Sequence, residues 1–315
     1  MNIEQIADVC ADNGRRTIAV SSGNSVLLAA LDLEGRLFFS HNGTTASLFR
    51  KEAAENTSSL KNGYFNPGGD TLWPAPEGTC FGYCYASGVW MVPSALTSAR
   101  YDVIAQSANA FEIAADIQLI NNRQLGIPCR FIRKAQIDQL PDGSTRIEQF
   151  DAIEYTGTKV LSREDFMLAP WSLSQFSVTP DARASFGNPG VPVRDLYMPS
   201  GNLCTKEGET VFMRPDPGRR IQIALPEKSS FVRLFLPDKK MEITRTSAPL
   251  APGIESADIA DAPTDALPEK DVRYSIYNDP SGFMELEVAG GCKYSLEPGT
   301  VLGMNITNTI KTQEN

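Results

Sequence analysis

The sequence is poor in the residues from which metal sites are usually built. It has 315 residues but a single histidine, His41, and its six cysteines include no CxxC pair. Zinc sites are usually built from histidines and closely spaced cysteines such as CxxC pairs, so we expect no metal and no cofactor. The chain has no recognisable secretory signal, so the cysteines are expected to be free thiols.

Positive charge and long apolar runs are also scarce. The net charge is −9, the isoelectric point is about 4.8, and no basic run occurs. Nucleic acid and anionic membrane surfaces are therefore unsuitable partners. No segment approaches the roughly 20 consecutive apolar residues that a membrane helix needs. The sequence predicts a soluble, cytoplasmic protein and leaves its oligomeric state open.

Helical periodicity is nearly absent, since only residues 3–10 suggest a helix. Period-two alternation of apolar and polar residues dominates, which is typical of half-buried strands. Residues 180–190 are expected to be a loop, and residues 247–269, rich in Ala, Pro and Asp, a long surface loop. The pattern predicts an all-β fold, a large antiparallel β-sandwich with a single domain over residues 1–315. Strands are expected at residues 17–21, 26–31, 36–40, 98–106, 111–119, from 127, 146–155, 166–178, 211–214, 219–225, 231–236, 241–246, 272–277, 283–288 and 300–310.

Residues 62–93 form the most distinctive stretch, dense in proline and glycine. Such density predicts a rigid, shaped loop and argues against a regular central strand. The stretch carries Trp73 and Trp90 together with Asp70 and Glu77. An indole face packs on the apolar face of a sugar ring, and a carboxylate accepts hydrogen bonds from sugar hydroxyls. Burial of both tryptophans in the core is the alternative interpretation.

Two further segments carry candidate functional groups. APWSLSQF places Trp171 beside a proline and ends in a polar face with Gln175. GFMELEV places Glu285 and Glu287 on one face of a predicted strand, about 7 Å apart. If both carboxylates point into a cleft, one pKa should rise, which suits a general acid or base. Exposure of both to water is the alternative.

Three segments in this order, GGDTLWPAPEG, APWSLSQF and GFMELEVAGGCKYSLEPGTVLGMNIT, resemble the galactose-mutarotase-like superfamily. Most similar is an uncharacterised branch with a GGDxLWPAPE-type motif. The resemblance covers about residues 15–310. It implies a β-supersandwich of the galactose-mutarotase-like type whose concave face binds a small carbohydrate.

In the epimerases of this superfamily, a histidine protonates the ring oxygen and a glutamate takes the proton of the anomeric hydroxyl. The resemblance makes Glu285 or Glu287 the counterpart of that glutamate. The corresponding histidine would lie near Trp171, where this chain has none. His41 lies in a predicted hairpin, HNGTT, where we expect it to be solvated and not catalytic. Either another group, such as Asp70, Glu77 or Tyr101, is the acid, or the site binds sugar without this chemistry.

We therefore expect a carbohydrate-binding mutarotase-like protein. As an enzyme it would be a sugar epimerase with a non-standard acid/base pair. Free galactose and glucose should bind with weak or absent mutarotation. The alternatives are a polysaccharide lyase or glycoside hydrolase on the same fold, and a non-catalytic β-sandwich interaction module. The candidate catalytic residues are Glu285 and Glu287. The candidate substrate-binding residues are Asp70, Trp73, Glu77, Trp90, Arg100, Tyr101, Trp171 and Gln175.

Overall fold

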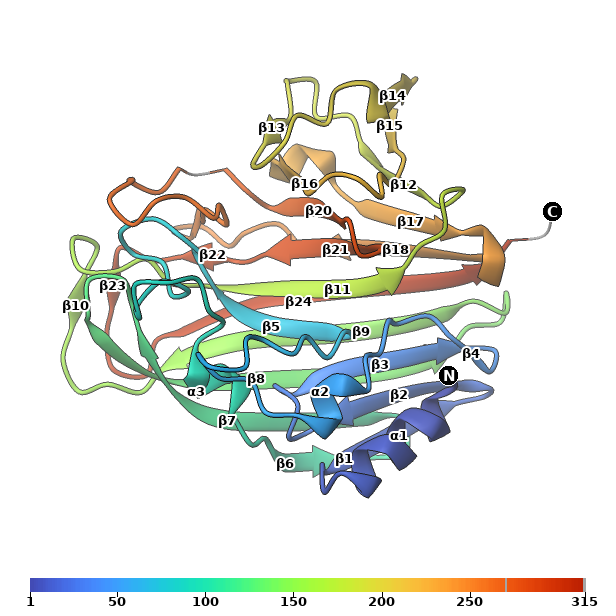
Figure 1. Ribbon diagram of the computed structural model, residues 1–315, viewed down its shortest axis with the longest axis horizontal. Helices are drawn as coiled ribbons and strands as arrows, with labels where there is room; N and C mark the ends of the chain where they lie inside the picture. Colours follow the sequence, from blue (N-terminus) through green and yellow to red (C-terminus); the bar gives the residue numbers. More distant parts are fainter. Residues whose placement is uncertain (270, 314–315) are drawn as a thin grey trace.

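Antiparallel strands are the main regular structure of the chain (Figure 1). The computed structural model describes residues 1–269 and 271–313. Two large sheets of ten strands each pack face to face, and their long strands run horizontally in Figure 1. The predicted all-β fold is confirmed. The larger of two hydrophobic clusters includes residues from Val20 to Ile310, and a smaller one packs helix α1, Ile3–Asp12, against one of the two large sheets; the single domain stays a prediction.

The first sheet has the strand order β1-β2-β3-β5-β11-β21-β20-β16-β13, with β4 paired to β3. Its strands are β1 Thr17–Ser22, β2 Ser25–Ala30, β3 Arg36–His41, β4 Thr44–Thr45, β5 Asp70–Ala75, β11 Ala169–Ser177, β13 Arg194–Asp195, β16 Ile221–Leu225, β20 Tyr274–Asp279 and β21 Phe283–Ala289. β5, β11 and β21 are neighbours in this order although they come from distant parts of the sequence. The centre of the sheet, β5-β11-β21-β20, therefore brings together the three segments that the sequence singles out.

The second sheet has the order β14-β15-β12-β17-β18-β24-β9-β8-β7-β6. Its strands are β6 Asp102–Gln106, β7 Ala110–Ile120, β8 Gly126–Gln139, β9 Thr145–Tyr155, β12 Arg183–Gly187, β14 Cys204–Glu207, β15 Thr210–Met213, β17 Val232–Leu236, β18 Met241–Ser247 and β24 Val301–Thr312. Two small pairs complete the strands: β10 Leu161–Ser162 with β23 Ser295–Leu296, and β19 Glu255–Ser256 with β22 Gly291–Cys292. Because β12 occupies residues 183–187, the prediction that residues 180–190 form a loop is wrong for their middle.

The few helices are short. They are α1 Ile3–Asp12, α2 Glu52–Glu55 and α3 Ser94–Thr97, with 3-10 turns at Gly201–Leu203, Glu227–Ser229 and Pro237–Lys239. A reciprocal capping box between Asn2 and Gln5 begins α1, and Ile3, Ile6 and Cys10 form its buried face. Among the described residues, no helix has the length and apolar character needed to cross a bilayer.

The stretch 62–93 contains a central strand, β5, which corrects the expectation of a loop without one. Pro74 lies opposite Pro170 of β11, so neither missing N–H breaks a hydrogen bond between the two strands. On its other side β5 pairs with β3 only at Asp70, opposite Leu37. Pro74 therefore has no partner strand on that side to which an N–H would donate.

Residues 247–269 follow an irregular path, but the prediction that they form a surface loop is wrong for their middle. Ala257, Asp258 and Ile259 are buried. The backbone N–H of Gly78 donates to the carbonyl of Ala260 at 3.0 Å. The segment therefore packs against the chain just after β5, next to Glu77.

His41 is buried, so the prediction that it is solvated is wrong. It ends β3, and its ring nitrogens lie 2.8 Å from Thr145 Oγ1 and 3.0 Å from Thr312 Oγ1. Burial lowers the pKa of His41. The hairpin between β3 and β4 thus packs against β9 and β24. The alternation pattern of a single strand does not predict such a contact between distant strands.

Candidate functional site

A cleft of about 150 Å³ lies over the centre of the first sheet. All three tryptophans, Trp73, Trp90 and Trp171, contribute to its lining. Trp73 of β5 is directly opposite Trp171 of β11, and their ring centroids are 6.1 Å apart with the planes at 76°. Tyr64 continues this aromatic wall at 6.2 Å from Trp73 and 6.3 Å from Trp90. An aromatic surface of this kind suits the apolar face of a sugar ring.

A row of polar side chains crosses the same face of the sheet. Gln175 of β11 is opposite Glu285 of β21, which is opposite Tyr277 of β20. Tyr277 is in turn opposite Gln222 of β16. Residues paired in register point to the same face. The row therefore lines one side of the cleft beside the tryptophans.

Each indole N–H in the cleft donates to a different glutamate. These hydrogen bonds fix the orientation of the rings, and they bring a carboxyl group next to each tryptophan. The bonds run from Trp73 to Glu34 (3.4 Å), from Trp90 to Glu77 (2.6 Å) and from Trp171 to Glu287 (3.1 Å).

Two carboxyl groups that line the cleft have pKa values near neutrality. Burial, with a smaller contribution from the charge of Asp261, raises the pKa of Glu77 to about 7. Burial likewise raises the pKa of Glu285 to about 7. Glu287 lies deeper than Glu285, and burial followed by the charge of Glu285 raises its pKa well above the ordinary value. At neutral pH both Glu77 and Glu285 can therefore donate or accept a proton.

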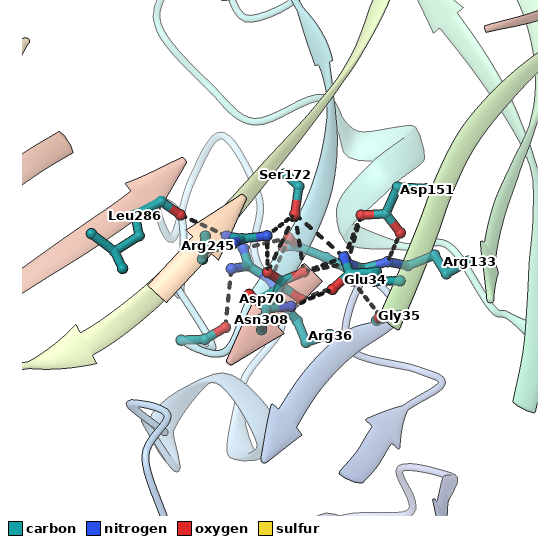
Figure 2. Close-up of polar contacts among 12 residues, drawn as sticks. Glu34, Gly35, Arg36, Asp70, Arg133, Asp151, Ser172, Arg245, Leu286 and Asn308 are labelled. Carbon is teal, nitrogen blue, oxygen red and sulfur yellow. Dashed lines mark hydrogen bonds and ion pairs between the residues drawn. The ribbon is translucent and has the colours of Figure 1, made fainter. Parts of the chain in front are cut away.

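Asp70 does not reach the cleft. It lies between the two sheets, where Arg133 and Arg245 of the second sheet contact its carboxylate (Figure 2). The Arg245 contact measures 2.9 Å, and Arg133 also pairs with Asp151 at 2.9 Å. Although burial opposes ionisation, the two arginines hold the pKa of Asp70 below its usual value. Asp70 is three residues before Trp73 on one strand, so the two side chains point to opposite faces.

Arg100 and Tyr101 also lie elsewhere. Arg100 lines a separate cavity of about 300 Å³ that also contains Asp32. Tyr101 is buried in the core against Gly35. Of the ten candidate residues, the structure brings six together around the cleft: Trp73, Glu77, Trp90, Trp171, Gln175 and Glu285.

Several lining residues are absent from the sequence-based prediction. Four of them lie inside the segments that the sequence singles out: Tyr64 and Asn66 in the stretch 62–93, Leu173 in APWSLSQF and Phe283 in GFMELEV. The others come from segments whose place beside β21 has no local signal: Tyr197, Arg220, Gln222, Tyr277 and Asp279. Arg220 stacks on Tyr197, 3.8 Å from the ring centroid, and donates to the Tyr277 hydroxyl at 3.1 Å.

A larger cavity of about 460 Å³ lies to the side of the cleft, between residues 58–60 and 83–97. Tyr83, Met91 and Ile120 are among its lining residues, and no Asp, Glu, Lys, Arg or His lines it. Cys84 lines it too, but burial raises the pKa of its thiol well above the ordinary value. An apolar cavity with an inert thiol offers no proton transfer, so the smaller cleft is the better candidate site.

Solved structures share this arrangement of strands. A galactose mutarotase-like protein from Lactobacillus casei ATCC 334 aligns with a TM-score of 0.58 and 12% identity, covering 94% of this chain and 100% of that one. The fold is that of the galactose mutarotase-like proteins. Two more mutarotase-like structures agree: a galactose mutarotase related enzyme from Lactobacillus acidophilus (TM-score 0.53, 9% identity, 95% and 99% covered) and a GalM/aldose epimerase homologue from C. elegans (0.54, 9%, 95% and 100%). No family model and no curated protein matches the chain by sequence.

Proposed function

We propose that the protein binds a monosaccharide in the cleft and interconverts its anomers, with carboxyl groups in both proton-transfer roles. One observation carries this proposal: Glu77 and Glu285 line the same small, tryptophan-walled cleft with pKa values of about 7. Buried glutamates thereby supply what a histidine supplies elsewhere, a group that exchanges protons at neutral pH.

We assign the two roles by the likeness of the fold. Glu285, on a C-terminal strand like the glutamate of the mutarotase-like epimerases, acts as the base and takes the proton of the anomeric hydroxyl. Glu77, in its protonated form, gives a proton to the ring oxygen as the C1–O5 bond breaks. The open-chain aldehyde rotates about C1–C2, and the ring closes on the other face as the two protons return. Proton counts balance, and no oxidant or reductant is needed.

The neighbours of these groups support the assignment. Gln175 Nε2 donates to Glu285 Oε1 at 2.7 Å, which holds the carboxylate in place. Trp90 Nε1 donates to Glu77 Oε1 at 2.6 Å, so the Oε2 atom can carry the proton toward the sugar. Glu287, kept neutral beside Glu285, positions Trp171.

The size of the cleft favours a single sugar over a polymer. Its volume of about 150 Å³ is small, because pockets for drug-sized ligands typically hold about 300–1,000 Å³. A polysaccharide lyase or hydrolase needs a longer groove with several subsites. The cleft therefore supports a monosaccharide epimerase over these alternatives, and a non-catalytic interaction module would have no use for two carboxyls with raised pKa values.

The test measures the anomerisation of freshly dissolved α-anomers by polarimetry, and binding by tryptophan fluorescence. The panel contains glucose, galactose and mannose with their 2-amino derivatives. On the sugar that reacts fastest, Glu285→Gln and Glu77→Gln should each lower the rate by about 100-fold or more, the usual contribution of a general acid or base. Asp116→Asn is the matched control, since this aspartate lies on β7 with its side chain 78% exposed.

Wild-type rates in both glutamine variants would show that the two glutamates do not transfer the protons. If no sugar of the panel changes the tryptophan fluorescence or anomerises faster than in buffer, the proposed function is wrong.

A further inference from the structure

The deep part of the cleft offers hydrogen-bond acceptors that have no partner. Gln175 is 3% exposed, its amide N–H donates to Glu285, and its Oε1 accepts no hydrogen bond from the described residues. Glu77 is also buried, and the indole of Trp90 donates to its Oε1 atom, so in its ionised form Glu77 offers Oε2 as a further acceptor. Buried acceptors are rarely left without a donor because their desolvation is then uncompensated. A ligand that brings donors would satisfy them.

Apart from the O–H of a protonated carboxyl group, most donors in the deep part are, in contrast, already used. The three indole N–H groups bond to glutamates, and the amide of Gln222 donates to Glu287 at 3.0 Å. The Tyr64 hydroxyl donates to Glu34 at 3.2 Å, and the Tyr277 hydroxyl donates to Asp279 at 2.7 Å. The other side-chain donors of the lining include those of Asn66, Tyr197 and Arg220, which are partly or fully exposed.

The charged side chains that line the cleft are mostly acidic, so they too favour a ligand that donates hydrogen bonds. Glu77, Asp279 and Glu285 face a single cationic side chain, Arg220. Burial opposes the ionisation of Asp279, but hydrogen bonds from Ser281 and Tyr277 hold its pKa below the usual value. Asp279 is therefore ionised at neutral pH.

The cations near the cleft are already engaged. Arg220 donates to the hydroxyls of Tyr277 and Tyr197, at 3.1 and 2.6 Å, and its Nη1 lies 3.6 Å from Asp261. Arg50 does not line the cleft and stacks on Phe283, 4.9 Å from the ring centroid. The lining therefore has carboxyl groups and aromatic faces to offer a further cation, and little to offer an anion.

A protonated amine fits the unpaired acceptors, the negative charge and the aromatic faces of the cleft. It brings three donors and no acceptor, its charge matches the carboxyl groups, and the faces of tryptophan and tyrosine rings attract cations. We infer that the sugar bound in this cleft is a hexosamine with a free amino group, an inference that rests on the proposed function. Sugar phosphates and sugar acids bring acceptors and negative charge, so the same lining disfavours them.

The test compares matched sugars by fluorescence titration of the wild type, below the pKa of the sugar amine. The pairs are glucosamine with glucose, galactosamine with galactose, and mannosamine with mannose, each with the N-acetyl derivative as the uncharged control. For at least one pair, the amino sugar should bind about tenfold or more tightly than its hexose, and the N-acetyl derivative should lose this gain. Asp279→Asn or Glu77→Gln should reduce the preference several-fold, and Asp116→Asn should retain it.

The outcomes separate this inference from the proposed function. If hexoses bind but no amino sugar binds more tightly than its hexose, the inference is wrong and the proposed function stands. An amine preference that is unchanged in both Asp279→Asn and Glu77→Gln also overturns it, since the carboxyl groups of the cleft would not be its cause. If none of the sugars binds, both fall.

Discussion

Replacing Glu77 by glutamine should change how the stability of the protein depends on pH. Burial raises the pKa of Glu77 from 4.5 to about 7. The folded protein therefore holds a proton that the unfolded chain releases between these values. Stability from this group is fully present below pH 4.5 and is lost as the pH rises through 7, opposite to the usual effect of a salt-bridged carboxylate.

The size of the effect follows from the difference in pKa. A rise from 4.5 to about 7, at about 1.4 kcal/mol for each pKa unit, gives on the order of 3 kcal/mol over the full range. Most of this change falls between pH 5 and pH 8, so the wild type should lose roughly 2–3 kcal/mol there that Glu77→Gln does not lose. The glutamine carbonyl can still accept the indole N–H of Trp90, which keeps the local hydrogen bond.

Urea unfolding at pH 5, 6, 7 and 8 measures this difference directly. The free energies of unfolding of the wild type and Glu77→Gln should converge or cross as the pH rises, while Asp116→Asn should follow the wild type. Parallel curves for the wild type and Glu77→Gln would refute the argument, because they would show that Glu77 titrates alike in the folded and unfolded states.

Three other substitutions test separate parts of the structure. Arg133→Ala should cost about 3–5 kcal/mol in urea unfolding, because it leaves the buried carboxylates of Asp70 and Asp151 without this partner; a loss below 1 kcal/mol would contradict this. His41→Ala should leave anomerisation by the folded protein unchanged in polarimetry, since His41 does not line the cleft, and a lost rate would show otherwise. Trp73→Ala should weaken sugar binding about tenfold in calorimetric titration, an estimate from aromatic stacking, and wild-type affinity would exclude a contact with the sugar.

Strand positions could be read from the sequence because alternation is a local property. The predicted strands at residues 111–119, 146–155 and 283–288 lie within β7, β9 and β21. β5 could not be read this way, because Pro74 argues against a strand unless the opposite residue is known. That residue is Pro170, almost a hundred positions later, so the compatibility of the two prolines is a tertiary fact.

The errors at the candidate site have two sources: a strand that was missed, and strand neighbours that the sequence does not reveal. The error on Asp70 follows from the missed strand β5: once residues 70–75 form a strand, the odd spacing between Asp70 and Trp73 places the two side chains on opposite faces. The roles of Tyr277 and Gln222 were not accessible, because they depend on β20 and β16 following β21 in the sheet. Hydrophobic patterns predict which residues are buried, but not which strands are neighbours.

The raised pKa values link the proposed catalysis to stability. Among the described residues no histidine lines the cleft, so a neutral-pH acid there must be a carboxyl whose ionisation the protein makes unfavourable. The same burial that makes Glu77 and Glu285 useful must therefore destabilise the folded protein above pH 7. Each glutamine variant should consequently lose anomerisation and gain relative stability at pH 8 together. A variant that gains this stability but keeps its rate would show that the raised pKa belongs to the packing of the cleft and not to the reaction.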